Sequence, residues 1–126
     1  MGTDSRSVAE IVEADAAELA TLGYTAEQVA SRMQTITNTA KAGLGNWVRI
    51  DDERQAVVEE ARGFTICPWP HGGHCAKRVT TIERLDSNQT IHFSDLNIHM
   101  IAEHGFFEGK GSPFRIEPGK LIDIIF

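Results

Sequence analysis

The side chains best suited to metal chemistry gather in one stretch of the chain, residues 67–104. This stretch contains both cysteines and all five histidines of the 126-residue sequence. Cysteine thiolate and histidine imidazole are the protein ligands that zinc prefers, and four of them complete a closed tetrahedral site. The sequence therefore predicts a zinc site in this stretch. Its expected ligands are Cys67, Cys75, His99 and His104, with His71 and His74 as alternates.

The fifth histidine, His92, is not expected to join these ligands. It stands between Ile91 and Phe93 in a strand-like run, and successive side chains of a strand point to opposite faces. If the two apolar neighbours face the core, His92 faces away from it. A single histidine or cysteine is more often a buried or surface residue than a ligand, so the zinc prediction depends on the whole cluster.

The residues from Phe93 to His104 resemble the helix of a Cys2His2 zinc finger. That family places an aromatic residue before the helix, then Leu-x-x-His, and then a second histidine three to five residues further on. Phe93, Leu96, His99 and His104 stand in these places, and the matched part covers about a tenth of the chain. The resemblance implies a ββα unit in which a β-hairpin precedes this helix and zinc joins the two.

The cysteine spacing is wider than in that family. Seven residues separate Cys67 from Cys75, and twenty-three separate Cys75 from His99, whereas the family has about two to four and about twelve. A longer β-hairpin between Cys75 and His99 accounts for the second difference, the wider spacing of these two residues. A histidine from the loop, His71 or His74, accommodates the first difference by taking the place of a cysteine.

The spacing of the two helix histidines sets a further condition on a shared ion. Because His99 and His104 are five residues apart, their side chains lie about 140° apart around an ideal helix. Both reach one ion only if the end of the helix unwinds. Gly105 follows directly and permits such a change of backbone direction.

The N-terminal elements follow from helix start signals and periodicity. Ser7 and Thr25 each open a capping box, and apolar residues at helical spacing follow both. Glycines at positions 23, 43 and 45 end the two apolar runs. We expect an antiparallel helical hairpin over residues 1–45.

Extended structure is expected from residue 46 onward. The runs 78–85 and 90–93 are separated by turn-forming residues and predict a β-hairpin. Ser94 is placed to cap the short helix that follows, and Glu117 and Pro118 begin a last turn or helix. The predicted fold class is therefore α+β, with the helical hairpin packed on a small antiparallel sheet. We expect a single domain, residues 1–126, whose second part, 46–126, carries the Cys/His cluster.

Composition and charge narrow the class of protein. The chain has 41% hydrophobic and 24% charged residues, as globular proteins do, and no apolar run approaches the roughly 20 residues that span a membrane. The formal charge of −6 comes from residues 1–61, which hold eleven acids against five bases. Nucleic-acid binding is disfavoured because neither half is basic. Without an apolar signal segment we expect a cytoplasmic protein with reduced cysteines.

The function predicted from these observations is a structural zinc site that supports a surface for a protein partner, with no catalysis required. The alternative is a metal- or cysteine-dependent enzyme. In that case Glu103 serves as a base for metal-bound water, or Cys75 acts as a nucleophile beside a histidine. A weaker alternative is an anion site formed by residues 109–112 together with Arg115, although the order Gly-Lys-Gly-Ser departs from a phosphate-binding loop.

Overall fold

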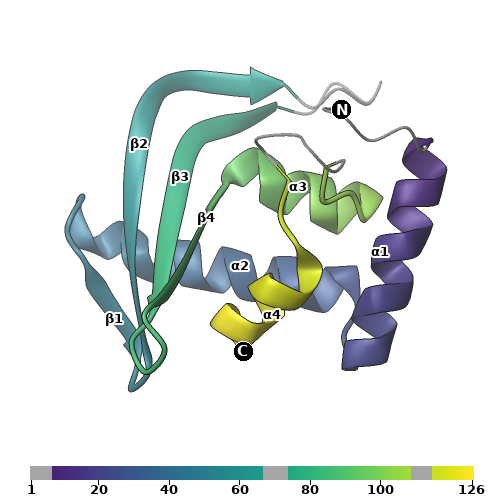
Figure 1. Cartoon of the computed structure of the whole chain (residues 1–126). Helices are drawn as coiled ribbons and strands as arrows, with labels where there is room; N and C mark the ends of the chain where they lie inside the picture. The colour runs from purple at the N-terminus through teal and green to yellow at the C-terminus, as the bar shows by residue number, and fades with distance from the viewer. Residues whose placement is uncertain (1–6, 67–73, 109–114) are drawn as a thin grey trace.

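The computed structural model describes residues 7–66, 74–108 and 115–126, and for 61–66 and 74–77 it describes the backbone alone. The described residues form four α-helices, a 3-10 turn and a four-stranded antiparallel sheet (Figure 1). In chain order these are α1 (Val8–Leu22), α2 (Ala26–Ala40), the 3-10 turn η1 (Lys41–Gly43), β1 (Val48–Asp51), β2 (Arg54–Ile66), β3 (His74–Arg84), β4 (Gln89–Ser94), α3 (Asp95–His104) and α4 (Pro118–Ile125). The predicted α+β class is confirmed.

Side-chain caps fix the starts of the first three helices, as the sequence predicts. The hydroxyl of Ser7 accepts a hydrogen bond from the Glu10 N–H. Thr25 and Gln28 form a complete capping box, in which each side chain accepts from the other residue's N–H, at 3.2 and 2.9 Å. Ser94 and Asn97 form the same reciprocal pair at the start of α3. These bonds satisfy N–H groups that the helix itself leaves without a partner.

The first two helices do not pack side by side as the predicted antiparallel hairpin. They are joined through Gly23, whose φ of 86° lets the chain turn sharply. Figure 1 shows α1 steeply inclined to α2, near the N-terminal end of α2. α1 packs on α4, while α2 packs on β1, β2 and α3. Helical periodicity predicts which face of each helix is buried, but it does not say which element covers that face.

The sheet has the strand order β1-β2-β3-β4, with each strand antiparallel to the next. β2 and β3 form its longest pair, and β3 starts at His74 rather than near residue 78. Their register shifts between Glu60 and Phe64, where β2 advances four residues against two on β3. Such a bulge bends the strands. Figure 1 shows the far half of this hairpin curving toward the side on which α3 lies.

One hydrophobic cluster joins the helices to the sheet. Leu19 of α1, Met33 of α2, Ile82 and Phe93 of the sheet and Leu121 of α4 are each at most 1% exposed. A buried hydrogen bond of 2.7 Å between the hydroxyls of Thr37 and Thr80 crosses the same core. Residues from both predicted parts, 1–45 and 46–126, therefore share one core.

Three arginines hold the C-terminal end of α4. Arg54 is 6% exposed, and it donates to the Ile124 carbonyl at 2.7 Å and to the Phe126 carbonyl. Arg32 donates to the Ile125 carbonyl at 2.8 Å, and Arg84 donates to the carbonyl of residue 123. A helix ends in carbonyls without intrahelical partners, and cations there also oppose the negative end of the helix dipole. These contacts fix α4 against α2, β2 and β3.

Candidate metal site

Helix α3 brings two of the predicted zinc ligands together. The imidazole rings of His99 and His104 have centroids 5.8 Å apart and lie nearly perpendicular, at 84°. Both residues are half-buried. The helix stays regular through His104 and ends at Gly105, whose φ is 61°. The rings therefore approach each other although the helix stays wound through His104, and the predicted unwinding of the helix end does not occur.

The separation of the two rings can be compared with zinc geometry. A zinc–nitrogen bond is about 2.0–2.1 Å long, so two imidazoles on one tetrahedral zinc have centroids roughly 5 Å apart. The observed 5.8 Å exceeds this by less than 1 Å. The distance between the two rings is therefore close to the distance expected for two imidazole ligands of one zinc ion.

The cysteine side of the predicted site is only partly described. Cys67 and His71 lie outside the described residues, and of His74 and Cys75 the structure gives the backbone alone. Cys75 lies opposite Thr65 in the β2–β3 ladder, and His74 lies opposite Ile66. Both residues therefore belong to the far end of the hairpin that curves toward the α3 side of the molecule in Figure 1.

The rest of the described chain adds no further ligand to this pair. Within residues 7–60, 78–108 and 115–126, whose side chains are described, no three His, Cys, Asp or Glu residues gather as a metal ion requires. Glu103, the base of the predicted enzyme alternative, is exposed. His92 is also exposed, while its neighbour Phe93 is 1% exposed. The predicted orientation of His92, away from the core, is confirmed.

Arg115 is committed to a buried ion pair and cannot serve the predicted anion site. It donates to both carboxylate oxygens of Asp15, at 2.6 and 2.9 Å, to both of Glu117, each at 3.2 Å, and to the Glu108 carbonyl at 2.8 Å. These five bonds use all five N–H groups of a guanidinium. Burial lowers the pKa of Arg115, but the two carboxylates outweigh it and raise the pKa, so the charge is permanent. Arg115 therefore has no donor left for a bound anion, and residues 109–112, the rest of the predicted anion site, lie outside the described residues.

A second charged cluster lies at the start of α3. Arg78 lies 3.3 Å from a Glu60 oxygen and 3.4 Å from an Asp95 oxygen, and Lys41 is near enough to influence Asp95 electrostatically. Burial, together with the nearby Glu60 carboxylate, raises the pKa of Asp95 more than these two cations lower it. The Nε atom of Arg78 and the Oδ1 atom of Asp95 are buried without a hydrogen-bond partner in the described part of the chain. Sequence reasoning missed this cluster, because nothing in the local pattern separates these residues from surface charges.

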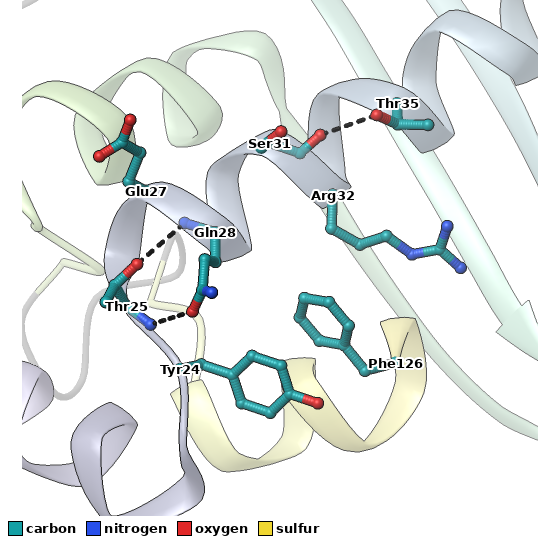
Figure 2. Close-up of a pocket in the computed structure, with 8 residues that line it drawn as sticks. All are labelled: Tyr24, Thr25, Glu27, Gln28, Ser31, Arg32, Thr35 and Phe126. Atoms are coloured by element: carbon teal, nitrogen blue, oxygen red, sulfur yellow. Dashed lines mark hydrogen bonds between the residues drawn. The ribbon is translucent and has the colours of Figure 1, made fainter.

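A groove of about 580 Å³ lies on the exposed side of α2 (Figure 2). The rings of Tyr24 and Phe126 stack in it with centroids 4.3 Å apart. Its polar groups already have structural roles, since Thr25 and Gln28 form the capping box, and Arg32 binds the α4 carbonyl and Asp51. We therefore assign this groove to the packing of α4 on α2.

Comparisons with protein-family models, with curated proteins and with solved structures find no match to this chain. No helix in the described residues is long and apolar enough to cross a membrane. The imidazole pair of α3 is therefore the feature of the described chain from which we infer a function.

Proposed function

We propose that this protein binds one zinc ion in a structural site and that the site fixes a surface for a protein partner. The proposed ligands are His99 and His104 of α3, Cys75 of β3, and Cys67, which follows β2 in the sequence. His71 or His74 is the replacement if a cysteine does not coordinate. The observation that carries the proposal is the imidazole pair, 5.8 Å apart on one helix.

The proposed zinc ion has a structural role, which is to stabilise the far end of the β2–β3 hairpin. The hairpin formed by β2 and β3 continues beyond the bulge after Glu60, where the other strands of the sheet no longer accompany it. A two-stranded hairpin by itself is marginally stable in water. Zinc bound to ligands from the hairpin end and from α3 joins the two, and its binding free energy adds to folding. The surface composed of hairpin and helix then keeps one shape for a partner.

The number of protein ligands distinguishes this proposal from the enzyme alternative. Two thiolates and two imidazoles fill a tetrahedral zinc and leave no position for substrate. Three protein ligands and one water form the arrangement that activates water in zinc enzymes. We do not expect α3 to bind nucleic acid as the helix of a zinc finger does. Its residues Asp95 and Glu103 are acidic and repel phosphate.

Cobalt substitution tests the proposed ligand set. Cobalt(II) replaces zinc in such sites, and we expect thiolate charge-transfer bands and the strong visible bands of a four-coordinate ion. Cys75→Ser and His99→Ala each weaken the spectrum and the affinity. His92→Ala is the matched control, because His92 is exposed and lies on β4, and it leaves both unchanged. A six-coordinate cobalt spectrum, or bands unaffected by Cys75→Ser and Cys67→Ser together, contradicts the proposal.

A further inference from the structure

Arg78 stands where the β2–β3 hairpin extends beyond the rest of the sheet. In the described chain the β3–β4 ladder ends with the pair of Val79 and Ser94, so Arg78 is the first residue of β3 beyond it. Across β2, Arg78 pairs with Glu60, the last residue before the bulge. We call the part of the hairpin beyond this pair, residues 61–66 and 74–77, the hairpin arm. Arg78 therefore lies at the root of the hairpin arm.

The side chain of Arg78 connects this root to the start of α3. Its Nε atom lies 3.3 Å from Oε1 of Glu60, and its Nη1 atom lies 3.4 Å from Oδ2 of Asp95, the first residue of α3. The Glu60 side chain is 62% exposed, and an ion pair that solvent screens is worth little. The side chains of Arg78 and Asp95 are 18% and 16% exposed, so their attraction is screened less. The stronger of the two contacts is therefore the one between hairpin and helix.

The ion pair of Arg78 and Asp95 is not arranged for the greatest stability. The Nε atom of Arg78 and the Oδ1 atom of Asp95 are buried, and neither has a hydrogen-bond partner among the residues that the structure describes. Buried polar atoms without partners cost free energy, and a buried ion pair often stabilises a fold no more than apolar residues of similar volume would. Such a pair can instead specify how two elements meet. Here the two elements are α3 and the root of the hairpin arm.

We propose that Arg78 is a positioning residue, which through Asp95 holds the hairpin arm at one angle to α3 and so presents the zinc ligands of the hairpin to His99 and His104. His99 lies about one helical turn after Asp95, so the ion pair fixes the hairpin close to the first imidazole. A two-stranded hairpin needs such a contact, because by itself it is marginally stable. Figure 1 shows the arm curving toward the side on which α3 lies. This inference rests on the proposed zinc site.

Zinc affinity and hydrogen exchange of the full chain test this role. Arg78→Met keeps the apolar stem of the side chain and removes its charge. We expect zinc binding to weaken about tenfold or more, and amide exchange in the arm of the metal-free protein to become faster, because the angle of the arm is no longer fixed. Arg84→Met is the matched control. It removes an ion-paired arginine, 23% exposed, from the opposite end of β3, and leaves zinc affinity and arm exchange unchanged.

Asp95→Asn breaks the same ion pair from the helix side with a side chain of the same shape. It keeps the role testable if a circular dichroism melt shows that Arg78→Met does not fold, and we expect a similar loss of zinc affinity. The double variant should bind zinc no more weakly than the weaker single variant, since both changes remove one contact. Single variants that bind zinc as tightly as the wild type overturn the positioning role and leave the proposed zinc site standing. A wild type that binds no zinc overturns the proposed function itself, and this role with it.

Discussion

The buried ion pair between Asp15 and Arg115 joins residues one hundred positions apart, and its removal has a predictable cost. Their side chains are 3% and 6% exposed, and two hydrogen bonds of 2.6 and 2.9 Å connect them. Asp15→Ala leaves the guanidinium buried with Glu117 as its one carboxylate partner. Removal of one member of a buried pair costs about 3–5 kcal/mol. We therefore expect the free energy of unfolding to fall by that amount in urea titrations at pH 7.

A double-mutant cycle distinguishes this reasoning from a simple loss of packing. The cycle combines Asp15→Leu with Arg115→Met and compares the double variant with these two single variants. Because no charge of the pair remains buried in the double variant, its loss of unfolding free energy is smaller than the sum of the two single losses, by about 2 kcal/mol or more. Asp86→Ala is the matched control, since the ion pair of Asp86 with Arg84 is exposed and worth about 1 kcal/mol or less. If Asp15→Ala is no more costly than Asp86→Ala, or if the double variant is additive, the argument from buried charge is wrong.

Three further predictions follow from other residues of the fold. Arg54→Met removes hydrogen bonds to the carbonyls of Ile124 and Phe126 and to Asp51, and should lower the free energy of unfolding by about 3 kcal/mol in urea titrations; a loss below about 1 kcal/mol contradicts the role of this arginine. Leu44→Asn relieves backbone strain at an exposed position, so the same titration should show no loss and up to about 1 kcal/mol of gain. Burial raises the pKa of Asp51, but the Glu53 N–H, Arg54 and Arg32 outweigh it and lower the pKa below its usual value. The stability from Asp51 is therefore present above its usual pKa of about 3.9 and lost as the pH falls through the lowered value, so Asp51→Asn should flatten the acid side of the stability–pH curve.

Helix starts were predictable because their signals are local. Ser7, Thr25 and Ser94 bond to backbone groups within three residues, so the pattern in the sequence contains the whole interaction. The length of β2 was not predictable in the same way. Val57 and Val58 point to opposite faces of the strand, yet they are 8% and 4% exposed. Because both faces are covered there, the alternation that normally marks a strand is absent from the sequence.

Long-range polar contacts escaped prediction for a different reason. Arg54 and Arg115 bind partners 70 to 100 residues away, and an arginine in a sequence is usually a solvated one. The residues of the imidazole pair were predictable from the sequence, but the approach of their rings was not. Composition and spacing identified His99 and His104 as candidates, but the ideal helix angle placed their side chains apart, and the structure brings the rings to 5.8 Å.

The metal content of the purified protein tests the central claim most directly. We expect about one zinc per chain in the wild type and in His92→Ala, and little zinc in His99→Ala or His104→Ala. Chelation of the zinc should unfold the β2–β3 hairpin end while the core of α2, α3 and the sheet persists, as hydrogen exchange can report. A wild type purified without zinc that gains none on titration, and whose hairpin exchange is the same with and without the metal, contradicts the account.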